Sequence, residues 1–209
     1  MHRRLAFWIL LVAVALVAWF LKPAGPRNYV NLSPTARGEW IAFGDSLTAG
    51  YGAGEGRDFP RLLAQRLGVS IRNLGVPGDT TQNGLARLDD AAKAQPRVVL
   101  LCLGGNDSLQ QMPREQTFKN LGAMIDRFHA AGSFVVLIGV RSATVRDKNE
   151  KLFKELAREK KVLLVPNILD GLLTDPRLMS DTIHPNDAGY ERIAEKLENA
   201  LRPVMEKLK

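Results

Sequence analysis

A serine and a histidine are the residues of this chain whose types and spacing could do chemistry. Ser46 lies in the segment Gly-Asp-Ser-Leu at 44–47, directly after the apolar run 40–43. A serine hydroxyl is a weak nucleophile near neutral pH and needs a base within hydrogen-bond reach. Because glycine, aspartate and serine are also common in turns, this segment taken alone fits a structural turn as well as a nucleophile.

His184 is the candidate for that base. His2 precedes a long apolar run and His129 falls in a helical pattern, whereas His184 lies in an Asp-x-x-His-Pro segment within a predicted loop. Asp181, three residues earlier, could accept a hydrogen bond from Nδ1 and orient the ring. An aspartate that begins a turn before a helix-starting proline explains the same segment, so both interpretations stay open at this point.

Three groups could stabilise the negative oxygen that forms during acyl transfer. They are the backbone N–H of Ser46, the backbone N–H of Gly75 and the side-chain amide of Asn106. Loss of one such donor typically lowers turnover by about 10²–10³. Turn formation by Gly75 and helix capping by Asn106 are the structural alternatives.

Short apolar runs alternate with helical patterns and would bring these residues together. The expected strands are 40–44, 70–74, 97–103, 133–140 and 161–165. The expected helices are 58–67, 81–94, 117–131, 147–160 and a last helix from 187. This alternation predicts an α/β fold, a three-layer doubly wound five-stranded parallel sheet. Since the carboxyl ends of parallel strands share one edge, the four polar segments 44–47, 73–79, 104–107 and 181–185 should meet there.

The amino-terminal residues indicate targeting. An uninterrupted apolar run of 17 residues, 5–21, follows two arginines and would form a helix about 25 Å long. We expect residues 1–22 to be one hydrophobic helix, a signal anchor or signal peptide, because the run nearly spans a bilayer. Residues 23–38 read as a linker and 39–209 as one domain. The domain would be exported to the periplasmic or extracytoplasmic side, tethered to the cytoplasmic membrane or released.

The charge balance argues against a nucleic-acid-binding protein, and the cysteine content excludes a protein held by an internal disulfide. Of the 29 basic residues, four precede residue 28 where no acid occurs, so 25 basic residues face 22 acidic ones in the remainder, a net charge of +3 rather than +7. We expect no nucleic-acid partner from that balance. The single cysteine, Cys102, lies in an apolar strand pattern, which indicates a core residue and excludes an internal disulfide.

In combination, the polar segments resemble the sequence blocks of the SGNH (GDSL) hydrolase family. Four residues match, in order, the serine, glycine, asparagine and histidine of the family's name: Ser46, Gly75, Asn106 and His184. The stretches 44–51 and 78–88 are most similar to the bacterial arylesterase and thioesterase I/lysophospholipase L1 branch. The resemblance implies a flavodoxin-like sheet and hydrolysis of carboxylic esters or thioesters through a covalent acyl-serine, without metal or cofactor.

The expected partners follow from this resemblance and from the apolar amino terminus. They are a small acyl-ester or lipid substrate and, through the amino-terminal segment, a membrane; no obligate protein partner is indicated. Medium-chain acyl esters are the expected substrates. Six apolar residues before the Asp-His segment either line an acyl groove or pack under the last helix: Ile168, Leu169, Leu172, Leu173, Leu178 and Met179.

Four other interpretations remain. A membrane-tethered binding module could keep the fold without turnover. A nucleotide-binding domain would use the glycine-rich stretch 50–56, but the second strand ends in Arg72 and Asn73 instead of the acidic residue that this fold requires. An α/β-hydrolase has Gly-x-Ser-x-Gly, and Thr48 stands where its second glycine belongs. A metal hydrolase would draw on the carboxylates and the histidine of the same edge. Those residues are Asp45, Asp79, Asp107, Asp181 and His184.

Overall fold

A five-stranded parallel sheet forms the centre of the protein. The architecture is taken from a computed structural model, in which residues 28–140 and 149–208 are described. The strand order is β2-β1-β3-β4-β5, and every neighbouring pair is parallel. The strands are β1 (Trp40–Gly44), β2 (Ile71–Gly75), β3 (Val98–Cys102), β4 (Phe134–Ile138) and β5 (Leu163–Val165).

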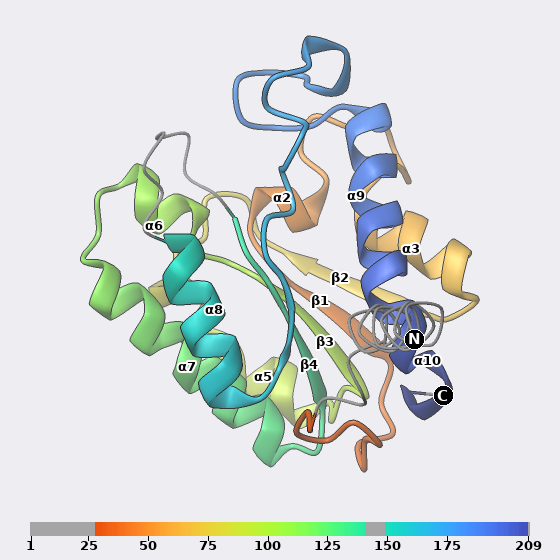
Figure 1. Cartoon of the computed structure of the whole chain (residues 1–209), viewed down its shortest axis with the longest axis vertical. Coiled ribbons are helices and arrows are strands. Elements are labelled where there is room, and N and C mark those ends of the chain that lie inside the picture. The colour runs from red at the N-terminus through yellow and green to blue at the C-terminus, as the bar shows by residue number, and fades with distance from the viewer. Residues whose placement is uncertain (1–27, 141–148, 209) are drawn as a thin grey trace, which may run out of the picture.

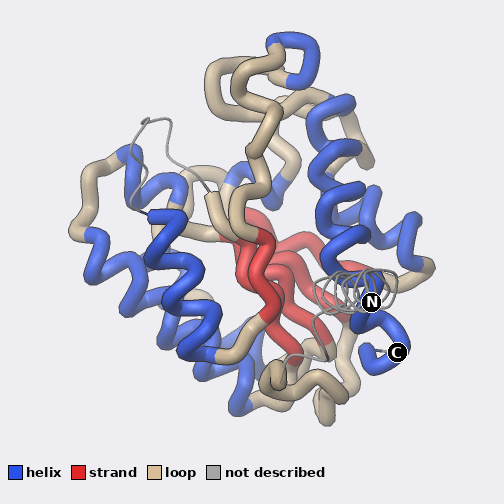
Figure 2. The backbone as a smooth tube through the Cα atoms, viewed as in Figure 1, coloured by secondary structure: helices blue, strands red, loops and turns tan. Residues whose placement is uncertain are grey.

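Helices cover both faces of this sheet. With α9 and α3 on one face and α5, α7 and α8 on the other, the sheet lies between two helical layers (Figures 1 and 2). This arrangement confirms the predicted three-layer doubly wound α/β fold. The helices are α2 (Ser46–Ala49), α3 (Phe59–Leu67), α4 (Thr81–Ala86), α5 (Leu88–Lys93), α6 (Gly105–Leu109), α7 (Arg114–Ala130), α8 (Asn149–Lys160), η1 (Pro176–Leu178), α9 (Asp187–Leu201), η2 (Arg202–Val204) and α10 (Met205–Leu208).

Strands β1, β3 and β4 are apolar throughout because helices bury both faces of the sheet there, whereas the edge strand β2 contains Arg72 and Asn73 and is partly exposed. In β1, Trp40 and Ala42 belong to the apolar cluster that contains the residues of α3 and α9. Ile41 and Phe43 belong to the opposite cluster, which contains the residues of α7. Side chains of a strand alternate between faces, so one strand contributes to two cores.

The strand register brings three loops to the same edge. Gly44, the last residue of β1, pairs with Gly75 of β2 on one side and with Cys102 of β3 on the other. Cys102 is buried in the core as expected. The chain segments that follow these three residues therefore leave the sheet side by side, which is the convergence that the sequence predicts.

Two boundaries differ from the sequence expectation. The predicted helix 81–94 is two helices, α4 and α5, because the backbone of Arg87 lies at φ −112° and ψ 7°. Residues 28–38, expected as linker, instead pack on the domain. Tyr29 stacks edge-on against Phe134 with ring centroids 5.9 Å apart, and the amide of Asn31 donates to two backbone carbonyls at 2.9 and 3.0 Å. The packed domain thus begins before residue 39.

The expected hydrophobic helix at 1–22 lies outside the described residues. Among residues 28–140 and 149–208, no helix is long and apolar enough to cross a bilayer.

Candidate active site

Ser46 is the first residue of α2, immediately after β1. Asp45 caps this helix, with its Oδ1 accepting the N–H of Leu47 at 3.0 Å. The helix ends after one turn at Gly50, whose φ of +85° is the left-handed conformation that glycine adopts freely. The strand and the short capped helix together fix Ser46 at the carboxyl edge of the sheet.

A chain of hydrogen bonds joins Ser46, His184 and Asp181. Nε2 of His184 lies 3.1 Å from Oγ of Ser46, and Nδ1 lies 2.7 Å from Oδ2 of Asp181. A carboxylate only accepts hydrogen bonds, so the ring proton belongs on Nδ1 and Nε2 can accept from the hydroxyl. The three side chains have the geometry of a nucleophile, a base and an orienting acid.

Asp181 is held ionised by its surroundings. Partial loss of solvent alone would raise its pKa, but hydrogen bonds from His184 and from the backbone N–H of Ile183 lower the pKa to about 2. Its Oδ1 accepts the N–H groups of Ile183 at 2.8 Å and His184 at 2.7 Å. The Asp181 carboxylate thus binds both the backbone of the loop that carries His184 and the imidazole ring that it orients.

The imidazole of His184 also packs against an aromatic ring. The ring of Tyr51, which is 57% exposed, lies 4.6 Å from the ring of His184 at a tilt of 51°. The hydroxyl of Tyr190 in α9 donates to the carbonyl of Tyr51 at 2.9 Å. This contact fixes the loop after α2 beside the histidine.

Asn106 is the second residue of α6 and lies in the same cavity as Ser46 and His184. Its Nδ2 donates to the carbonyl of Asp79 at 2.9 Å. An amide NH₂ carries two N–H donors, so the second remains for another acceptor. The backbone N–H of Ser46 makes no hydrogen bond within the described part of the chain.

Gly75 does not supply the expected donor. Its N–H is already bonded to Oδ1 of Asn73 at 2.9 Å. The close approach of α2 explains the glycine instead, because a Cβ at position 75 would lie 2.2 Å from the backbone nitrogen of Ala49 in that helix. The expectation that Gly75 supplies an oxyanion donor is therefore wrong, and the glycine is explained by its close packing against α2.

Gly78 is the donor candidate that the sequence analysis missed. Its φ is +87°, and its N–H has no hydrogen-bond partner among the described residues. The loop around it is held on one side by the N–H of Val76, which donates to the carbonyl of Gly44 at 3.0 Å. On the other side the amide of Asn106 holds Asp79. The available sequence signal was a glycine two residues before Thr80, the residue that caps α4.

An apolar cavity of about 470 Å³ adjoins the serine. Of the six candidate groove residues, only Leu169 and Leu173 line it. Ile168 and Leu172 are buried in the core, which is the packing alternative. Leu178 and Met179 are partly buried against that core. The aliphatic residues of the cavity are Leu47, Leu109, Val140, Leu169, Leu173 and Ile183.

The carboxylates of this edge each have a separate partner. Asp79 accepts from Nε of Arg87 at 2.7 Å, and Asp107 accepts the N–H of Thr81 at 2.9 Å. Burial, together with the negative charges of Asp79 and Asp107, raises the pKa of Asp45 to about 7. Within the described residues, no group of three or more histidine, cysteine or acidic side chains is arranged to hold a metal ion.

Comparison with known proteins identifies the family. A model of the GDSL-like lipase/acylhydrolase family matches residues 42–192. The chain belongs to this family. The GDSL-like relatives include "Thioesterase 1/protease 1/lysophospholipase L1" of Escherichia coli (strain K12), 34% identical over 79% of this chain and 84% of the relative. An "Arylesterase" of Vibrio mimicus is also 34% identical, over 74% of this chain and 84% of the relative.

The fold comparison agrees with this GDSL-like assignment. The crystal structure of TesA superposes with a TM-score of 0.74 at 30% identity, covering 79% of this chain and 98% of that chain. Membership in the family makes this protein a carboxylic ester hydrolase, and it confirms the resemblance inferred from sequence. The matched span contains Ser46, Gly78, Asn106, Asp181 and His184.

Proposed function

We propose that the protein hydrolyses carboxylic acyl esters or thioesters through a covalent acyl intermediate on Ser46. The observation that carries this proposal is the hydrogen-bonded chain from Asp181 through His184 to the hydroxyl of Ser46. A serine becomes a competent nucleophile when an oriented base lies within hydrogen-bond reach of its hydroxyl.

Acylation begins when Oγ of Ser46 attacks the acyl carbonyl and Nε2 of His184 takes the hydroxyl proton. The imidazolium that results is stabilised by Asp181, whose low pKa keeps it ionised. When the tetrahedral intermediate collapses, His184 gives this proton to the leaving alcohol or thiol. The acyl group then remains on Ser46.

Three donors hold the negative oxygen of the tetrahedral intermediate. They are the backbone N–H of Ser46, the second N–H of the Asn106 amide, and the N–H of Gly78 in place of Gly75. Preorganised donors of this kind stabilise the charge that develops in the transition state without having to reorient. Water, deprotonated by His184, then attacks the acyl-serine through an equivalent intermediate and restores Ser46.

The substrate class follows from the lining of the cavity. Its walls beside Ser46 are mainly aliphatic, with Leu109, Leu169 and Leu173 among them. Burying methylene groups against such walls is favourable by about 0.8 kcal/mol per CH₂. We therefore propose acyl chains of medium length, bound in this cavity, as the preferred acyl donors.

We also propose that the domain acts outside the cytoplasm. The support is in the sequence, where the apolar run 5–21 follows two arginines and nearly matches the thickness of a bilayer core. An uncleaved segment of this kind would tether the hydrolase to the cytoplasmic membrane on its outer side.

The reaction is tested by assaying residues 28–209 on p-nitrophenyl esters from acetate to palmitate, with Ser46→Ala and Ser108→Ala as variants. Ser108 lines the same cavity and is the matched control. We expect Ser46→Ala to lower kcat by at least about 10⁴, and Ser108→Ala to retain most activity. Medium chains should give the highest kcat/KM.

Two results would contradict the proposal. One is a Ser46→Ala variant as active as the wild type. The other is a wild type that binds ester analogues but turns over none of the esters, which is what a tethered binding module would do.

A further inference from the structure

Arg87 lies at the junction of α4 and α5, and its guanidinium is hydrogen bonded to three segments that meet at the site. Nη2 donates to the carbonyl of Gly44 at 2.9 Å, and Nη1 donates to the carbonyl of Leu74 at 3.0 Å. Nε donates to Oδ2 of Asp79 at 2.7 Å. The ends of β1 and β2 and the loop that follows β2 are thereby joined through one rigid, planar group.

The side chain is confined as well as bonded. Its guanidinium carbon lies 4.0 Å from the centre of the Phe43 ring, and Phe43 is fully buried. The side chains of Arg87 and Asp79 are 26% and 12% exposed. A stacked, largely desolvated guanidinium holds its partners more firmly than an ion pair in solvent.

Each of the three proposed oxyanion donors is linked to the Arg87 guanidinium through Gly44 or Asp79. Gly44 is two residues before Ser46 in the chain, and Asp79 directly follows Gly78. The carbonyl of Asp79 accepts the Asn106 amide at 2.9 Å. The side chain of Asp79 therefore binds Arg87 while its backbone positions Asn106.

We propose that Arg87 is a positioning residue that sets the spacing of the oxyanion donors Ser46, Gly78 and Asn106. This inference rests on the proposed function. It also gives a reason for the break between α4 and α5, because the non-helical backbone at Arg87 accompanies a side chain directed to the strand ends. Oxyanion stabilisation depends on donors fixed before the reaction, so loosening them lowers turnover more than substrate binding.

The test compares full-length wild type with Arg87→Met, which keeps an apolar stem over Phe43 but removes all three donors. We expect kcat to fall about 10- to 100-fold with KM changed less than about threefold. Arg127→Met is the matched control, because Arg127 makes a surface ion pair with Asp89 at 2.9 Å on the same side of the sheet. Its kcat should stay within about twofold of wild type.

A second readout separates positioning from general stability. Butylboronic acid bonds to a serine hydroxyl as a tetrahedral adduct and presents a negative oxygen to the oxyanion donors. Its inhibition constant should rise by the same factor as kcat/KM falls in folded Arg87→Met, while the affinity for butanoate stays unchanged. In an Arg87→Ala variant, guanidinium chloride below denaturing concentrations should restore part of kcat.

The outcomes distinguish this inference from the proposed function. An inactive wild type would overturn both, whereas an active wild type with an inactive Ser46→Ala supports the proposed function alone. A folded Arg87→Met with wild-type kcat and boronate affinity overturns the inference. If Arg87→Met does not fold, Arg87→Lys provides the test. Lysine keeps a cation for Asp79 but cannot bond all three partners, so wild-type kinetics in that variant would also overturn the inference.

Discussion

Asp45 is an acid buried directly beside the proposed nucleophile. Its side chain is among the least exposed polar groups, at 2%, and burial raises its pKa to about 7. The folded protein therefore retains a proton on Asp45 that the unfolded chain releases above about pH 4. The free energy of unfolding contributed by this group is fully present below that pH and is lost as pH rises through about 7.

Substitution Asp45→Asn should remove this pH dependence, because an amide oxygen can still accept the N–H of Leu47 without titrating. Between pH 5 and pH 8 we expect wild type to lose about 2–3 kcal/mol of stability relative to Asp45→Asn. Urea denaturation at both pH values measures this difference. The exposed Asp90 provides the control, since Asp90→Asn should track wild type. Parallel stability curves for wild type and Asp45→Asn would contradict the raised pKa.

At the same scale, the site was predictable where the chemistry depends on residue type and loop position. Ser46, Asp181, His184 and Asn106 each carry a side chain with few alternatives, and the structure brings all four to one edge. A backbone N–H donor, in contrast, cannot be recognised from residue type. Whether Gly75 offers its N–H depends on the Asn73 side chain that already occupies it, and no spacing rule in the sequence reports that bond.

At the scale of elements, a buried polar network fastens α6, the helix that carries Asn106. Asp107 is 1% exposed and accepts from the backbone and the hydroxyl of Thr81, at 2.9 and 2.5 Å. The hydroxyl of Thr117 in α7 donates to the same carboxylate at 3.1 Å, and Asn120 donates to Thr81. The carboxylate of one residue thus ties together α4, α6 and α7.

Removal of that carboxylate should therefore cost more than removal of one of its partners. Asp107→Ala leaves the N–H and the hydroxyl of Thr81 without an acceptor, each worth about 1–3 kcal/mol, while the Thr117 hydroxyl can still donate to the carbonyl of Pro113 at 3.4 Å, so we expect a loss of about 2 kcal/mol or more. Thr117→Val removes only one donor and should cost about 1 kcal/mol. Urea denaturation distinguishes them. Equal, small losses in the two variants would mean that the network does not hold α6.

Element boundaries show why periodicity alone is insufficient. The predicted helix 81–94 has helical spacing of apolar residues, yet it breaks at Arg87 where a side chain reaches the strand ends. The residues before 39 are rich in proline and polar groups, yet Tyr29 and Asn31 bind to the ends of other elements. In both cases long-range contacts set the boundary. The buried strands β1, β3 and β4 are unbroken apolar runs and were placed within a few residues, as was the more polar edge strand β2.

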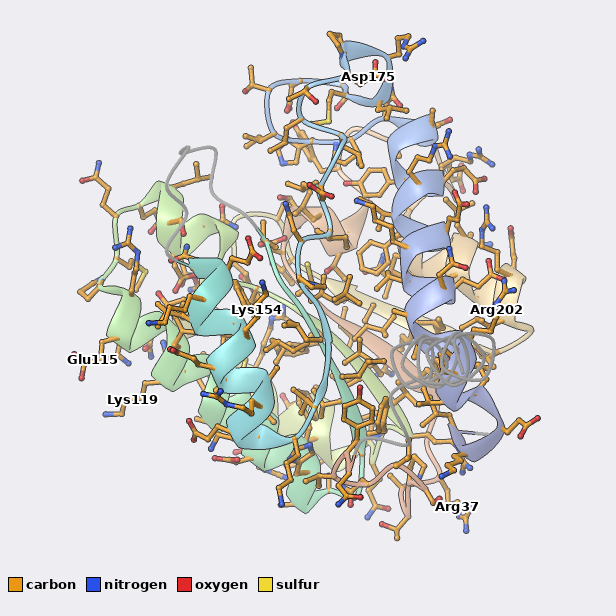
Figure 3. All side chains as sticks on the ribbon, viewed as in Figure 1. Arg37, Glu115, Lys119, Lys154, Asp175 and Arg202 are labelled. Atoms are coloured by element: carbon orange, nitrogen blue, oxygen red, sulfur yellow. The ribbon has the colours of Figure 1, made fainter. Side chains whose placement is uncertain are left out.

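At the scale of the whole molecule, the entry of the chain and the candidate active site lie at opposite edges of the sheet. Residues 30, 36 and 38 bond to carbonyls of Lys161, Gly132 and Gln95, each of which precedes a strand. The chain therefore enters at the amino edge of the sheet, while Ser46 and His184 lie at the carboxyl edge. Arg37 and Asp175 mark these opposite ends (Figure 3).

This polarity constrains the tethered arrangement that we propose. Residues 22–27 span at most about 20 Å when extended, and a domain of this size is about 40 Å across. A domain held at its amino edge would turn the cavity away from the membrane that holds it. Ester substrates would then arrive from the aqueous side or from a facing surface, rather than from the supporting bilayer.

Energy transfer from the protein to an acceptor lipid tests this orientation. We expect a fluorophore on Arg37→Cys in the full-length protein, reconstituted into vesicles, to transfer energy more efficiently than one on Asp175→Cys, because the amino edge lies nearer the bilayer. Cys102 is buried and does not compete for the label. Equal transfer from both positions, or stronger transfer from position 175, would contradict the orientation. Loss of vesicle association altogether would contradict the tether itself, since a released domain has no fixed direction toward the membrane.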